Sequence, residues 1–175
     1  VLGLWFVYPA ATERWPALTL QPPDGEETQS WYGLYWGADK IGLTPRKEVL
    51  GPNGRRFVEQ RRRYRMKVGD HEIGWKMAVM TQLDADGNVL ESEMARDDLP
   101  VRGHAALENH EMVMNWVVDG VPYSERLILH RQPVLLTALG ALPARVQADE
   151  RRTVQIFDPW SLELVFRHTD EAVLT

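Results

Sequence analysis

Apolar and polar residues alternate along much of this chain. This period-two pattern is typical of antiparallel strands that turn one face to a core and the other to solvent. It is clearest over residues 71–83, where one face carries Ile73, Trp75, Met77 and Val79. The opposite face carries Glu72, Lys76 and Gln82. Residues 111–118 repeat the pattern with Met112, Met114, Trp116 and Val118 on one side.

Turn signals divide the chain into short strands. Gly51-Pro52-Asn53-Gly54 and Asp84-Ala85-Asp86-Gly87-Asn88 are the strongest of these turns. The segments between turns predict strands at residues 31–36, 41–49, 55–68, 71–83, 89–96, 101–107, 111–118, 123–130, 151–157 and 161–167.

One segment has a helical period instead. Between Pro133 and Pro143, the leucines at 135, 136, 139 and 142 share a helix face, which predicts a short amphipathic helix over 133–142. The expected fold is therefore mainly β: a large curled antiparallel sheet, an open half-barrel, clasping one short helix. A closed lipocalin-like barrel is the alternative.

The two ends of the chain differ from its middle. Residues 1–9 are almost wholly apolar but fall short of the about 20 residues that span a bilayer. We interpret residues 1–11 as the remnant of a membrane anchor or signal segment; a buried first strand is the alternative. Residues 12–30 are rich in Pro, Gly and Glu and predict a tether. Residues 31–175 form the expected β-rich domain, truncated at its C-terminus because the strand 161–167 lacks a partner on one side.

The composition excludes several kinds of catalytic and metal-binding site. The chain has 175 residues, a net charge of −5 and no cysteine, which excludes a disulfide framework and a thiol nucleophile. Its five histidines lack metal-ligand spacing, and the serines lack a nucleophile elbow. Asp84-x-Asp86-Gly87 resembles a calcium loop, but predicted strands flank it, so we interpret it as a hairpin turn. The sequence predicts no metal, no cofactor and no enzyme.

Basic residues gather on one predicted strand. Arg55, Arg61, Arg63, Arg65 and Lys67 share a side with Phe57 and Glu59. Arg62 lies on the other side, with Val58, Tyr64, Met66 and Val68. The stripe could meet anionic lipid or single-stranded nucleic acid. We favour a solvated face paired with glutamates such as Glu72 and Glu91, and expect no nucleic-acid partner.

Tryptophan and methionine suggest a second kind of site. A groove for an apolar ligand could be lined by Trp36, Trp75, Met77, Met114 and Trp116. Such side chains more often form the core of a curled sheet, and we favour that interpretation.

Three motifs in order give a family resemblance. Trp31-Tyr-Gly-Leu-Tyr-Trp-Gly-Ala-Asp-Lys-Ile-Gly42 resembles the opening of the β-rich domain that precedes the catalytic core in bacterial transglutaminase-like proteins. Pro133-Val-Leu-Leu with Ala138-Leu139 is similar to its leucine-rich helix, and Val154-Gln-Ile-Phe-Asp-Pro-Trp-Ser-Leu162 to a later hairpin. Thr44-Pro45 departs from the family pattern, and a proline there predicts a sheet edge or a bulge.

The resemblance implies a curved, lipoprotein-carrier-like sheet in an exported or membrane-anchored protein. It implies a non-catalytic accessory or scaffold domain, periplasmic or elsewhere in the cell envelope, because the family's catalytic residues lie in a later domain. Its partner would be that downstream catalytic domain or a cell-envelope protein, and its contact with the membrane would be through the N-terminal segment alone. The alternative function is a small binding module for lipid or another apolar ligand of the envelope.

Overall fold

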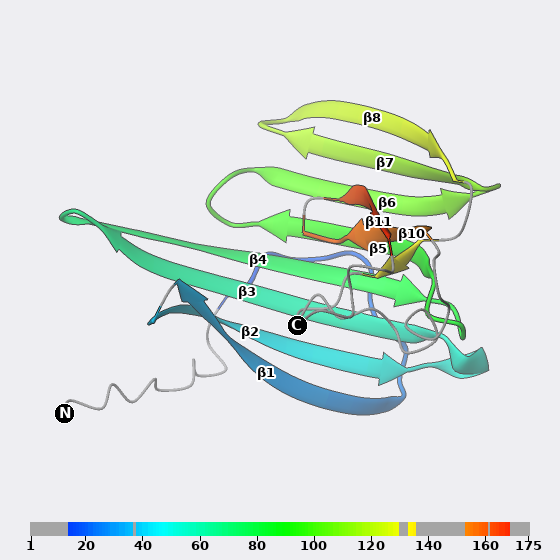
Figure 1. The fold of residues 1–175 in the computed structure, drawn as a ribbon, viewed down its shortest axis with the longest axis horizontal. Coiled ribbons are helices and arrows are strands. Elements are labelled where there is room, and N and C mark those ends of the chain that lie inside the picture. The colour runs from blue at the N-terminus through cyan, green and yellow to red at the C-terminus, as the bar shows by residue number, and fades with distance from the viewer. Residues whose placement is uncertain (1–13, 37, 130–132, 136–152, 161, 169–175) are drawn as a thin grey trace.

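Eight antiparallel strands in chain order form one large twisted sheet. The computed structural model describes residues 14–36, 38–129, 133–135, 153–160 and 162–168. The strands are β1 (Glu26–Trp36), β2 (Asp39–Leu50), β3 (Arg56–Val68), β4 (His71–Leu83), β5 (Val89–Arg96), β6 (Val101–Glu108), β7 (Glu111–Val118) and β8 (Val121–Ile128). Each pairs with its sequence neighbours, and the order ends at β1 and β8 (Figure 1). The sheet is not closed, which confirms the predicted open antiparallel sheet and excludes the alternative of a closed barrel.

The turns form where the sequence placed them. A short 3-10 turn, η1 (Pro52–Gly54), joins β2 to β3, and Asn53 within it has a φ of 60°. Between β4 and β5 the Gly87 amide donates to the Asp84 carbonyl oxygen (3.0 Å), and Gly87 has a φ of 81°. Asn and Gly are the residues that tolerate this left-handed region, which is why these segments reverse the chain.

β1 is longer than predicted, and β2 is not an edge strand. β1 begins at Glu26, inside the segment predicted to be a tether. β2 lies between β1 and β3, with Pro45 opposite Trp31. The ladder from β2 to β3 runs through Leu43 and resumes at Arg46, which leaves Thr44 and Pro45 out of it. The missing N–H of proline thus interrupts the ladder without moving the strand to an edge.

A smaller sheet of three strands completes the described fold. It contains β9 (Val134–Leu135), β10 (Thr153–Asp158) and β11 (Glu163–His168). β10 pairs antiparallel with β11 and parallel with β9, so β11 is an edge in the part of the chain that the structure describes. The predicted helix over 133–142 is wrong at Val134–Leu135, where pairing with Ile156 and Phe157 overrides the local helical period. Residues 136–142 lie outside the described residues.

The main core lies on the side of the large sheet that faces the β10–β11 hairpin, here called the inner face (Figure 1). It gathers fully buried side chains from most strands: Val58, Met77, Val79, Leu83, Val89, Met94, Ala105, Met112 and Met114. Phe157 and Leu162 of the hairpin are 0% exposed within it. A Cβ added at Gly103 would lie 2.3 Å from the Leu162 Cδ1 atom, so this hairpin packs directly on the β6 backbone.

The predicted register of β4 is correct, with one exception in burial. Met77 and Val79 are buried on the inner face, and Trp75 packs at its margin. Ile73 points to the same side but is 48% exposed, so the expectation that it is buried is wrong. It lies at the far end of a hairpin that is longer than the core beneath it, opposite Met66.

The opposite side of the large sheet, the outer face, carries a second small core. Val49, Phe57 and Met80 are buried there, and Leu18 and Leu20 pack against them. Residues 14–25, here called the strap, therefore lie on the sheet. Successive residues of β3 and β4 point alternately into the inner and the outer core, because side chains alternate between the two faces of a strand.

Candidate functional site

A cavity of about 470 Å³ lies between the strap and the outer face. Its apolar lining includes Trp15, Leu18 and Leu20 of the strap and Met80 of β4. Lys47 and Arg61 bring positive charge to its sheet side. Polar groups make up most of the surface that lines the cavity, so it is more polar than the usual small-molecule site, which is mainly apolar.

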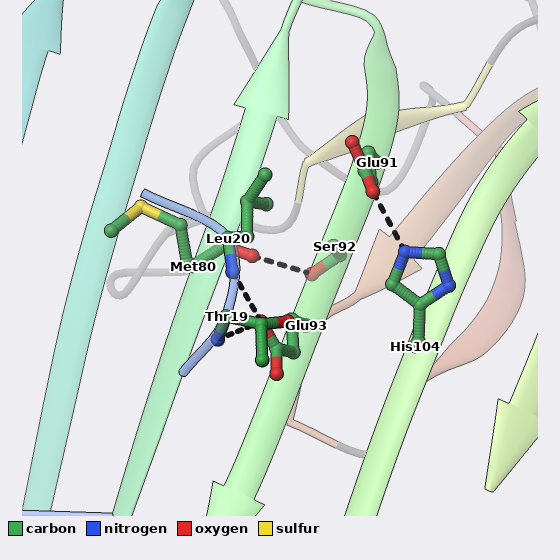
Figure 2. A network of polar contacts seen from close by, with 7 residues as sticks. All are labelled: Thr19, Leu20, Met80, Glu91, Ser92, Glu93 and His104. Carbon is green, nitrogen blue, oxygen red and sulfur yellow. Dashed lines mark hydrogen bonds and ion pairs between the residues drawn. The ribbon is translucent and has the colours of Figure 1, made fainter. Parts of the chain in front are cut away.

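Glu93 fixes the middle of the strap to the sheet. It lies on β5, is 6% exposed, and its Oε2 atom accepts three hydrogen bonds from the strap. The donors are the Thr19 amide (2.7 Å), the Thr19 hydroxyl (3.0 Å) and the Leu20 amide (2.7 Å), as Figure 2 shows. A carboxylate that receives backbone donors makes charge-assisted bonds, which are stronger than neutral ones.

Two cations hold the beginning of the strap. The guanidinium carbon of Arg61 lies 5.7 Å from the ring centroid of Trp15, and Lys76 Nζ lies 5.8 Å from the same centroid. Both distances are within the range of a cation–π contact. Lys76 Nζ also donates to the Arg14 carbonyl oxygen (3.2 Å). The strap thus bounds one side of the cavity and is fixed to the sheet at two separate points.

The strap residues were missed by the sequence analysis. Their Pro-rich, Glu-rich surroundings indicated a tether, although Leu18 and Leu20 show the one-residue alternation of a half-buried extended segment. That signal covers only two residues. Glu93 carried no signal at all, because a single glutamate in a strand is ordinarily solvated.

The arginine stripe lies on the outer face and is largely paired. Arg61 contacts Glu59 (2.5 Å), and Arg65 pairs with Glu72 on the neighbouring strand. The hydrogen bond to Glu72 raises the pKa of Arg65, and the same bond lowers the pKa of the Glu72 carboxyl. The predicted role of Glu72 is thus confirmed. Glu91 instead contacts His104 on β6, with 2.7 Å between Oε1 and Nε2 (Figure 2).

Four of the five residues predicted to line an apolar groove lie together on the inner face. Met77 and Met114 are buried, and Trp75 and Trp116 pack against the same cluster. The hairpin side chains Phe157 and Leu162 occupy the space in front of them. The side chain of Trp36 lies outside the described residues. These contacts are packing contacts, and a ligand role for the four residues stays a prediction.

The described parts of the chain contain no group of three His, Cys, Asp or Glu side chains that could hold a metal ion. They also contain no helix with the length and apolar character needed to cross a membrane.

Comparison with known proteins identifies no relative of this chain. No protein-family model matches the sequence, and no curated protein or solved structure matches it.

Proposed function

We propose that this chain is a non-catalytic accessory domain of an exported transglutaminase-like protein, where it positions a catalytic domain or binds a cell-envelope partner. The observation that supports a scaffold is the filled inner face. Phe157 and Leu162 are 0% exposed against the sheet, and Gly103 leaves no room for a Cβ. A rigid sheet with a packed interior suits a part that holds others in place.

Two of the three resemblance motifs support the same proposal because they coincide with hairpins, whereas the motif similar to the family's helix is a strand at Val134–Leu135. Trp31 to Gly42 lies on the β1–β2 hairpin, apart from the undescribed residue 37. Phe157-Asp158-Pro159-Trp160 ends β10, and the Asp158 carboxylate accepts a hydrogen bond from the Trp160 amide (2.9 Å). An Asp side chain that bonds the backbone two residues on is a turn-forming interaction, which gives this motif a structural reason.

The test is to identify the native polypeptide. We expect that an antibody to this domain, followed by mass spectrometry of the captured protein, detects peptides of a Cys-His-Asp transglutaminase-like domain in the same chain. We expect that protein in the membrane or periplasmic fraction. A captured polypeptide without that catalytic domain, or one confined to the cytosol, contradicts the proposal.

A second candidate is a binding module for an apolar ligand, and the cavity under the strap favours it. Its volume of about 470 Å³ lies within the roughly 300–1,000 Å³ of small-molecule sites. An aliphatic chain would lie between Trp15 and Met80. An acidic head group would compete with Glu27 for Lys47 and with Glu59 for Arg61.

Dodecanoate binding by calorimetry distinguishes the two candidates. Met80→Trp adds bulk to the cavity wall, so a binding module should lose affinity at least about tenfold. Val117→Trp is the matched control, because Val117 lies on the same sheet face but is 42% exposed and is not among the residues lining the cavity. Absence of dodecanoate binding to the unmodified protein, or equal loss in both variants, counts against the binding module.

A further inference from the structure

A buried polar set lies on the inner face, beside the apolar core. It consists of Thr44 on β2 and Gln60 and Arg62 on β3, and Thr44 and Gln60 are each 1% exposed. Leu43 pairs with Arg63 and Arg46 with Gln60, which places Thr44 opposite Arg62. Side chains opposite one another, or two apart on one strand, point to the same face and lie within reach of a single small molecule.

Four polar atoms of this set have no hydrogen-bond partner. Thr44 Oγ1, both amide atoms of Gln60 and Arg62 Nε are buried without a hydrogen bond in the described structure. Buried polar atoms in native proteins almost always have a partner, either protein or a bound molecule. Four such atoms on two adjacent strands therefore indicate that a bound molecule supplies their hydrogen-bond partners at this place.

Arg62 adds an oriented positive charge. Its guanidinium carbon lies 3.6 Å from the ring centroid of Trp160, so the indole covers the flat side of the group. The donors of a guanidinium lie in its plane, and stacking leaves them free at the edge. Burial lowers the pKa of Arg62, against the opposing effects of Tyr64 and Asp158.

The nearby carboxylates have other partners, and Asp158 also acts on Arg62 by its charge. Glu48 pairs with Arg46 (2.9 Å) and contacts Arg56 (3.6 Å). Asp158 accepts the Trp160 amide. Tyr64 and Asp158 act on the Arg62 guanidinium, but its Nε–H has no hydrogen-bond partner in the described structure, so an acceptor for this atom has to come from another molecule.

We propose that Thr44, Gln60 and Arg62 form a binding site for a small hydroxycarboxylate. The Arg62 Nε–H, the Gln60 Nε2–H and the Thr44 hydroxyl donate to the carboxylate, whose two oxygens accept several hydrogen bonds. The negative charge offsets the buried guanidinium. Gln60 Oε1 is an acceptor and requires a donor on the same ligand, which its hydroxyl group supplies. The site is independent of the cavity under the strap, because it lies on the opposite face of the sheet.

Nitrogen-15 NMR of the Gln60 side-chain amide and the Arg62 Nε–H tests the site directly. The probes are glycolate, acetate, which lacks the hydroxyl, and chloride at equal ionic strength. We expect saturable shifts with glycolate, binding at least about threefold weaker with acetate, and no saturable shift with chloride.

Two near-isosteric variants and one control complete the experiment. Thr44→Val and Gln60→Leu remove the unpaired atoms, so the ligand-free variants should be as heat-stable as the parent or more so. Both should reduce glycolate affinity at least about tenfold. Arg63→Gln, on the adjacent residue but the opposite face, should retain it.

Three results overturn the proposal. The first is the absence of any saturable shift with glycolate or acetate. The second is unchanged glycolate affinity in Thr44→Val and Gln60→Leu. The third is a Gln60 amide that shows cross-peaks to bound water and no response to either acid, which makes this a site for water alone.

Discussion

Replacing Glu93 with glutamine should loosen the strap from the outer face while leaving the sheet intact. Glu93 Oε2 accepts the Thr19 amide, the Thr19 hydroxyl and the Leu20 amide from a position that is 6% exposed. Glutamine has nearly the same shape, so it keeps the packing against the strand. It removes the charge and turns one acceptor into a donor.

The size of the effect follows from the bonds that change. A hydrogen bond to a charged group contributes about 1.5–3 kcal/mol, against about 0.5–1.5 kcal/mol for a neutral one. With two backbone donors at 2.7 Å affected, Glu93→Gln should lower the free energy of unfolding by about 2 kcal/mol. Glu93→Ala leaves both amides without an acceptor and should cost about 3–5 kcal/mol.

Urea denaturation gives the global effect, and hydrogen exchange at the amides of Thr19 and Leu20 gives the local one. Both amides should exchange much faster in Glu93→Gln, while amides within β3 and β4 should change far less. Glu91→Gln is the control, because Glu91 lies two residues away on the same face, is partly exposed and pairs with His104. An unfolding free energy within about 0.3 kcal/mol of the parent and unchanged exchange at Thr19 and Leu20 would refute the reasoning.

Three further predictions test the sheet and its charges. Met77→Ala should cost about 2–4 kcal/mol by urea denaturation, whereas Ile73→Ala, at a site 48% exposed, should cost less than about 1 kcal/mol; equal losses would show the burial of β4 to be wrong. Gly103→Val should destabilise by about 1–3 kcal/mol because its Cβ meets side chains packed across β6, and a neutral result in the same assay would mean that the hairpin yields readily. Arg65→Gln should raise the pKa of the Glu72 carboxyl towards its ordinary value. Since this pKa is lowered in the folded state, the pair contributes at neutral pH and is lost as the pH falls through that lowered value; a carbon-13 NMR titration with no change between the proteins would contradict the pairing.

Most of the large sheet follows from local sequence. Gly and Asn at the turns fix where the chain reverses, and the period of two fixes which residues share a face. For this reason the predicted strands 71–83, 89–96 and 111–118 agree with β4, β5 and β7 to the residue. The same period of two placed Arg62 on the face of β3 opposite to the arginine stripe. On that face its guanidinium lies over the ring of Trp160.

The errors lie where distant segments meet. Val134–Leu135 has a helical pattern by itself, but pairing with β10 makes it a strand. Residues 14–25 resemble a tether by composition, and only contact with Met80, Val49 and Phe57 makes the strap part of the fold. In both cases the deciding hydrogen bonds or apolar contacts come from residues far away in the chain.

The sequence alone therefore determined the strand meander, its register and its two faces, because turn chemistry and side-chain alternation act between near neighbours. The tertiary structure decided which face of the large sheet the strap covers and which face the β10–β11 hairpin covers. It filled the predicted Trp and Met groove with Phe157 and Leu162, and it left a cavity beneath the strap. It also buried Thr44 and Gln60 without partners, since burial depends on what packs against a strand, and no local pattern specifies that.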